Sequence, residues 1–328
     1  MTVVPQTERL GVAARTRGLL REQPIIPLTG LLFLVVLLYS LVRPGVVDAD
    51  WAGVILRAAI PLAILAGCQT LTMLTGGIDL SVGAVASMAG FMVASLLNGP
   101  GLEVGIVVAL TAAMLAGLLT GIGVGIFRVH PLIMSLGVSF VVLGLANAWQ
   151  ILSVQSSTGV PPGFRTLGAD RFAELFPYSL VVFVPLAAII LIGLRRTGYG
   201  RMLYAIGDNP VAARLSGARG WQVLIVLYVL SALMAALAGF LLAGLTNVAS
   251  VTLADSLVLP SVAAAVIGGT SIFGGRGGYS GTIVGALILT VISALLTALS
   301  FPEAVRQVLF GTIIVVVAAT YSRVTGDT

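Results

Sequence analysis

The chain has 328 residues, of which 58% are hydrophobic and only 9% are charged, and its formal net charge is +5. Soluble domains carry roughly 25% charged residues, so a chain this apolar could not keep its surface in water. At about 20 residues a span, this length allows at most about a dozen membrane spans and leaves no room for a sizeable soluble domain.

All 17 basic residues are arginine. Without lysine, the chain can form neither a P-loop nor a Schiff base, so any ATP it depends on must be hydrolysed by another chain. A single cysteine, Cys68, excludes an intrachain disulfide, and a single histidine, His130, makes a zinc site unexpected. These counts leave too few groups for a catalytic site, so we predict a protein that is not an enzyme, with no metal and no cofactor of its own.

Apolar runs and their breaks predict an all-α bundle of about ten membrane-spanning helices, because an unpaired peptide group in lipid costs several kcal/mol. In chain order, the expected spans are 26–42, 52–74, 80–97, 104–127, 132–152, 179–194, 221–246, 257–272, 279–299 and 304–321. They make up a transmembrane domain of residues 26–321, between a cytoplasmic segment, 1–25, and a cytoplasmic tail, 322–328.

The positions of the arginines predict the orientation. If both termini are cytoplasmic, twelve arginines lie inside, four lie outside and Arg57 lies within a span, which fits the positive-inside bias. This distribution indicates contact with a membrane and not with nucleic acid. The long loop 195–220, with five arginines, is then cytoplasmic, and the long loop 153–178 is extracytoplasmic.

Glycines recur at helix-packing spacing in two spans, as Gly117, Gly121 and Gly125 and as Gly281 and Gly285. This spacing favours close packing between helices of one bundle, and a sliding seam or a homodimer contact is the alternative.

The first break between spans that carries polar residues is GGIDLSVG, residues 76–83. Gly76 and Gly77 can form the turn, and Asp79 can cap the helix that follows. Alternatively, Asp79 and Ser81 line or gate a pathway, because an acidic group this near the membrane core is a functional candidate. Gln69, Asn147 and Gln150 are further polar candidates for the pathway.

The cytoplasmic loop contains YAIGDNP, residues 204–210, followed by AARLSG, residues 212–217. Asp208 or Asn209 suits an N-cap, Pro210 the first helical position and Gly217 the stop, which predicts a two-turn helix over 210–216. So short a helix is marginal alone, so we expect it to rest on a partner's groove through a weakly apolar surface of Ala212, Ala213 and Leu215, or else on lipid headgroups.

A third segment, VIGGTSIFGGRGGYSGT at residues 266–282, holds seven glycines between positions 268 and 281. It predicts a glycine-rich turn between two spans, anchored on the cytoplasmic side by Arg276. Like the first break, it enters a span from inside through a pair of glycines.

These three segments, in this order, resemble the motifs of permease subunits of ribose/xylose/galactose-type ATP-binding-cassette importers, and PLIMSLG at 131–137 resembles the start of that family's fifth span. The resemblance implies a multi-pass protein of the bacterial plasma (inner) membrane that forms the translocation pathway for a sugar or related small polar solute. The implied partners are a second permease copy or homologue, ATPase subunits that bind ATP and Mg, and an extracytoplasmic sugar-binding protein.

The resemblance also assigns an ATPase-coupling role to one cytoplasmic segment. Its residues are Gly207, Asp208, Asn209, Pro210, Ala212, Ala213, Arg214, Leu215 and Gly217. Two alternatives stay open, an ion-coupled secondary transporter and a branched-chain amino-acid or nucleoside permease of similar architecture.

Overall fold

The computed structural model describes residues 25–97, 101–153, 159–172 and 175–325, with side chains described up to residue 316. Within these residues it consists of helices and loops without a β-strand, so the all-α prediction is confirmed. The expected cytoplasmic segment, apart from Ile25, and the last three residues of the tail lie outside the described residues, as do 154–158 and 173–174 of the outer loop.

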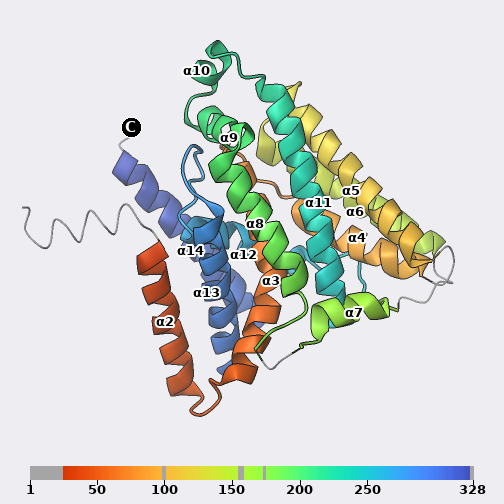
Figure 1. Cartoon of the computed structure of the whole chain (residues 1–328), viewed down its shortest axis with the longest axis vertical. Helices are drawn as coiled ribbons and strands as arrows, with labels where there is room; N and C mark the ends of the chain where they lie inside the picture. The colour runs from red at the N-terminus through yellow and green to blue at the C-terminus, as the bar shows by residue number, and fades with distance from the viewer. Residues whose placement is uncertain (1–24, 98–100, 154–158, 173–174, 326–328) are drawn as a thin grey trace, which may run out of the picture.

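Figure 1 shows the helices as one bundle. In chain order they are α2 (Ile25–Val42), α3 (Ala49–Met73), α4 (Val82–Leu96), α5 (Leu102–Gly125), α6 (Pro131–Leu152), α7 (Pro162–Ala169), α8 (Leu180–Arg196), α9 (Gly198–Asp208), α10 (Pro210–Leu215), α11 (Gly220–Thr246), the 3₁₀ turn η1 (Asp255–Leu257), α12 (Val258–Ile267), α13 (Tyr279–Ala298) and α14 (Glu303–Thr325). Each predicted span overlaps one of these α-helices, whereas α7 and α9 were not predicted.

Six helices among the described residues are long and apolar enough to cross a membrane: α2, α3, α5, α6, α11 and α13. A seventh span results if α8 and α9, which meet at a bend of 68°, are taken together. The predicted count of ten is therefore not confirmed.

Two helices, α4 and α12, are too short to cross a membrane because one begins and the other ends at a glycine break. α4 has 15 residues and α12 has 10, so they extend about 22 Å and about 15 Å, less than the roughly 30 Å of a hydrocarbon core. Nearly every residue of α4 is buried, and the helix packs between α5, α6 and α11. Both short helices thus belong to the interior of the bundle.

The glycine ridge of α5 packs on α11 of the same chain. A Cβ built on Gly121 would lie 2.7 Å from the Cα of Ile225, and one on Gly125 would lie 2.9 Å from the carbonyl oxygen of Trp221. Gly281 and Gly285 of α13 approach the backbone of α12 in the same way. Packing within one bundle is therefore the confirmed interpretation of both ridges.

The two ends of the bundle carry different elements, with α9 and α10 at one end and α7 at the other (Figure 1). α7 is fixed by side chains: the guanidinium of Arg57 donates to the carbonyl oxygen of Ala169, and Arg171 pairs with Asp50 at 2.6 Å. The ring of Phe164 also stacks on Phe240 of α11, 5.0 Å between centroids. The arginine within a span therefore has a structural partner.

Candidate functional site

The short helix predicted in the cytoplasmic loop is α10. The side chain of Asn209 caps it by accepting from two backbone N–H groups, at 3.0 and 2.9 Å, and Pro210 is its first residue. Gly217 follows its end with φ +87°. The local prediction is confirmed, with Asn209 and not Asp208 as the cap, because Asp208 is the last residue of α9.

The side chains of α10 divide between two faces. Leu215 is 85% exposed and Val211 is 59% exposed, and Ala212 and Arg214 are exposed as well. Ala213 is buried against the bundle, so the expectation that it enters a partner's groove is wrong. Residues 211 and 215 are one turn apart on one face, and residue 213, midway between them, therefore points the other way.

Gly207, at the end of α9, lies where three backbone segments meet. A Cβ built on it would overlap the carbonyl oxygen of Leu74 and lie 2.5 Å from the nitrogen of Gly275, which itself donates to Leu74 O at 3.0 Å. A Cβ on Gly274 would lie 2.7 Å from Gly207 O and 3.0 Å from the nitrogen of Gly76. We call these five residues the glycine junction, because only glycine lets the three backbones approach so closely.

The glycine junction joins three segments that the sequence had singled out separately. It brings together the end of α9, the first break, which spans residues 74–81 between α3 and α4, and the second break, which we define as residues 268–278 between α12 and α13. Gly274 and Gly275 have φ of +95° and +71°, which residues with side chains rarely adopt.

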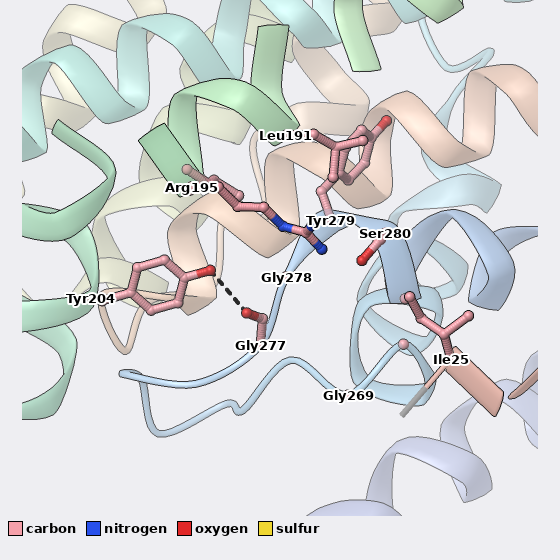
Figure 2. Close-up of a pocket in the computed structure, with 12 residues that line it drawn as sticks. Ile25, Leu191, Arg195, Tyr204, Gly269, Gly277, Gly278, Tyr279 and Ser280 are labelled. Carbon is pink, nitrogen blue, oxygen red and sulfur yellow. Dashed lines mark hydrogen bonds between the residues drawn. The ribbon is translucent and has the colours of Figure 1, made fainter. Parts of the chain in front are cut away.

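A hydrogen bond next to the junction also links α9 to the second break. Tyr204 donates its hydroxyl proton to the carbonyl oxygen of Gly277 at 2.9 Å, as Figure 2 shows. The same view shows Arg195 and Ser280 around the cavity, of about 480 Å³, that separates α8, α9 and the start of α13. α9 therefore touches the second break at two places, once through a side chain and once through its backbone.

The first break is built around the carboxylate of Asp79, which is only 2% exposed. It accepts from the nitrogen and the hydroxyl of Ser81, at 3.0 and 2.6 Å, and from the hydroxyl of Ser231 in α11 at 2.9 Å. Ser81, which is also buried, occupies the N-cap position of α4. The N-cap position therefore belongs to Ser81 and not to Asp79, although the Asp79 carboxylate does accept from a free N–H at the start of the helix, and it also joins the break to α11.

Two further polar side chains hold the backbone of the first break. Gln69 of α3, which is fully buried, donates to Asp79 O at 2.8 Å and accepts from Asp79 N at 3.2 Å. Ser135 of α6 accepts from Leu80 N at 3.0 Å. Together with Ser231, they bind the break to α3, α6 and α11. Ser231 was not among the predicted site residues, and a single serine within an apolar run gives no signal of its role.

The predicted pathway residues separate into two groups. Gln69, Asp79 and Ser81 are buried inside the chain, and Gly76 and Gly77 form the turn beside them, where a Cβ on Gly77 would meet the Tyr228 hydroxyl at 3.0 Å. Asn147 and Gln150 lie exposed on α6, and the amide of Asn147 donates to the carbonyl oxygen of Leu143 at 2.9 Å. Their roles in a pathway remain predictions.

Comparison with known proteins places this geometry in a family. The family described as branched-chain amino acid transport system permease component matches residues 52–318, a range that holds both breaks and α10. The chain belongs to this permease family. No solved structure matches the permease.

Named relatives agree with the family. The permease is similar to a fructose import permease protein of Rhizobium meliloti, 33% identical over 87% of this chain and 83% of the relative. It is also similar to a ribose import permease protein of Bacillus subtilis, 33% identical over 90% and 91%, and to an autoinducer 2 import system permease protein of Yersinia enterocolitica, 31% identical over 79% and 72%. The resemblance found in the sequence is confirmed, and the permease is a multi-pass protein of the inner membrane.

Proposed function

We propose that this permease, paired with a second copy or a homologue, forms the translocation pathway of an ATP-driven importer for a sugar or related small polar solute. ATP and Mg²⁺ are bound by separate ATPase subunits, and an extracytoplasmic binding protein delivers the solute. The names of the fructose, ribose and autoinducer 2 relatives support this class of solute, although the family description itself refers to branched-chain amino acids.

The glycine junction is the observation that carries the proposal. Exposed Val211 and Leu215 give α10 a small apolar surface that fits a groove on an ATPase. α10 follows directly on α9, whose last turn contacts both breaks through Gly207. A push on α10 by the ATPases would therefore shift the starts of α4 and α13 together, which is what switching the access of a pathway requires.

The proposed topology has ten membrane crossings with both termini in the cytoplasm. Since α4 and α12 are too short to cross alone, each crosses inside the bundle together with the non-helical residues beside it. The bias in arginine supports this orientation, because Arg195, Arg196, Arg201, Arg214 and Arg219 all belong to the α9–α10 end. The outer end is then that of α7, and the loop 153–178 is our candidate docking surface for the binding protein.

A second copy would complete the pathway along α6. Asn147 and Gln150 are exposed there, and a Cβ built on Gly137 or on Gly144 would meet nothing within 4 Å. Small residues allow helices to approach closely in lipid, and the two amides would supply polar groups for a solute. We propose that this face of α6 lines the pathway.

An ion-coupled transporter is the second candidate, and the structure offers it less support. Such proteins use ionisable side chains within the membrane, and the two side chains that would suit, Arg57 and Asp79, are already engaged in hydrogen bonds. The fixed partners of both side chains favour structural roles.

Uptake into proteoliposomes tests the proposal. The permease with its ATPase and binding protein should accumulate solute only when ATP is enclosed on the ATPase side. The permease alone, under a proton or sodium gradient, should accumulate none. Uptake by the permease alone would instead establish the ion-coupled alternative.

A further inference from the structure

A cavity beside α10 concentrates positive charge. It has a volume of about 460 Å³ and lies between the end of α5, α10 and the start of α11. Three arginines from three different segments line it: Arg128 after α5, Arg214 in α10 and Arg219 just before α11. Pro210, Ala213 and Arg214 of this lining belong to the segment with the predicted coupling role, whereas Arg128 and Arg219 have no role in it.

The charges around this cavity are not balanced by the residues that line it. Arginine keeps its charge at every pH that a protein meets, and like charges around one cavity repel each other. The residues that line the cavity include no aspartate or glutamate. The two ion pairs seen among the described residues involve Arg171 and Arg306, at other places in the chain. The three arginines are exposed, so water screens part of this repulsion, and an anion bound in the cavity would reduce it further.

The backbone of Arg128 is also unusual for a residue with a side chain. Its φ is +56°, the left-handed conformation that commonly ends a helix and that glycine adopts with least strain. The next residue, Val129, donates its backbone N–H to Gly123 O at 3.0 Å and so closes α5. A residue with a charged side chain therefore stands at a position where glycine would suit the backbone better, and this residue is one of those that line the cavity.

The remaining lining is apolar and fits a lipid. Val124 of α5 and Leu224 of α11 line the cavity from within their membrane-length helices, and Trp221, which is 47% exposed, lines it at the start of α11. Tryptophan is enriched where hydrocarbon meets headgroups, and basic pockets between membrane helices bind anionic headgroups. A free phosphate ion would use the arginines but would gain nothing from the apolar wall.

We propose that this cavity binds the phosphate of an anionic phospholipid, held by Arg128, Arg214 and Arg219, with the lipid's apolar part against Val124 and Leu224. Guanidinium groups suit phosphate because their planar N–H donors match its oxygens. Since Arg214 belongs to α10 and the other two do not, the lipid would tie α10 to the bundle. The proposed binding of a phosphate and an apolar chain follows from the residues that line the cavity. The expectation that this lipid belongs to the cytoplasmic leaflet rests on the proposed orientation.

The test measures how much phosphatidylglycerol stays bound to the purified permease, using native mass spectrometry after extraction from vesicles of phosphatidylcholine and phosphatidylglycerol. The variant neutralises two cavity arginines, Arg128→Gln with Arg219→Gln, and leaves Arg214 of α10 unchanged. The control neutralises two other arginines of the same end, Arg201→Gln with Arg276→Gln. At roughly 1 kcal/mol for each arginine, we expect retention to weaken about thirtyfold in the cavity variant and to stay near wild type in the control.

Arg128→Gly separates binding from folding. Glycine adopts the left-handed conformation with less strain, so the melting temperature in lipid-free detergent should stay equal or rise, while retention of phosphatidylglycerol should fall.

Equal losses in the cavity variant and the control would overturn the proposal, since they would show only a general attraction of a basic surface. Displacement of the bound phosphatidylglycerol by inorganic phosphate at millimolar concentration would overturn the choice of a lipid. Failure of ATP-driven uptake by the wild-type permease would affect the proposed function and leave this binding result unchanged.

Discussion

The two breaks in the bundle look alike in the sequence and are held in different ways. Residues 74–81 are bound by polar side chains of Gln69, Ser135 and Ser231, from three neighbouring helices, and by the buried carboxylate of Asp79 within the break. The second break, 268–278, lies in close contact with the backbone of Leu74 and Gly207, and its Gly277 carbonyl oxygen accepts a hydrogen bond from the Tyr204 hydroxyl.

This difference indicates how the two breaks divide the work. A network of buried hydrogen bonds fixes the first break to the core of the bundle, because separating its members leaves polar groups unsatisfied. A glycine-rich loop held largely by close backbone contact can follow a neighbour that moves. We infer that the first break is the anchored side of the glycine junction and that the second break is the side that follows α9.

Removing the Asp79 carboxylate should have the largest effect. Asp79→Ala leaves the hydroxyls of Ser81 and Ser231 without their acceptor in a buried site, which should lower the free energy of unfolding by about 3 kcal/mol. Thermal unfolding in detergent measures the loss. Asp79→Asn keeps an acceptor oxygen and should cost less, so it should lower transport while the permease still assembles with its ATPase.

A double-mutant cycle with Ser231→Ala checks the cause. If Asp79 acts through Ser231, the two substitutions together should cost clearly less than the sum of the single losses. Additive losses would show that the first break is not anchored to α11 through this pair.

Gly207→Ala should uncouple transport through the permease from ATP hydrolysis by its ATPase. The new methyl group meets backbone atoms of Leu74 and Gly275 that no rotamer change can move, so the strain should reach about 1–3 kcal/mol and transport should fall at least about tenfold. The measurement is ATP-driven uptake, normalised to ATPase bound. Gly198→Ala in the same helix is the matched control, because its nearest neighbour is the flexible end of Arg201 at 3.7 Å. Equal uptake by the two variants would remove Gly207 from the coupling route.

Leu215→Ala should weaken the binding of the ATPase about tenfold, because an exposed apolar anchor at an interface is worth more than about 1 kcal/mol. Leu152 is also 85% exposed but is the last residue of α6, away from α10, so Leu152→Ala provides the control. Binding of the purified ATPase to the permease in nanodiscs distinguishes them. Ala213→Arg should instead destabilise α10 itself, because Ala213 is buried against the bundle.

Tyr204→Phe should have the smallest effect. It removes a hydrogen bond of 2.9 Å to Gly277 and should cost about 1 kcal/mol in the contact between α9 and the second break. Uptake should fall by a factor of a few, with ATPase binding unchanged. A loss as large as that of Gly207→Ala would mean that the side chain and not the backbone carries the contact.

The elements that could be predicted from the sequence are those whose start and end signals lie within a few residues of each other. The cap, the first-position proline and the stop glycine of α10 act within a few residues, so they could be read directly from 209, 210 and 217. α9 was missed because Gly198 and Gly200 favour a loop, although Thr197 caps it by accepting from Gly200 N at 3.1 Å. α7 was missed because its prolines, which suit a helix start, also suit a turn.

The glycine junction could not be predicted in the same way. The three segments were each recognised, but Leu74, Gly207 and Gly275 meet only after α3, α9 and α12 have packed. The same holds for Ser231, whose partner Asp79 is 152 residues away in the chain. Spacing along one helix carries no information about such contacts.

Hydrogen exchange of the permease in nanodiscs, with its ATPase and with or without ATP, tests the central claim most directly. If α10 acts through Gly207, peptides covering residues 74–81 and 268–278 should change their exchange together when ATP binds, because the amide of Gly275 donates to Leu74 O. In Gly207→Ala, this joint response should be lost. A change confined to α9 and α10 in the wild type, with both breaks unaltered, would contradict the account.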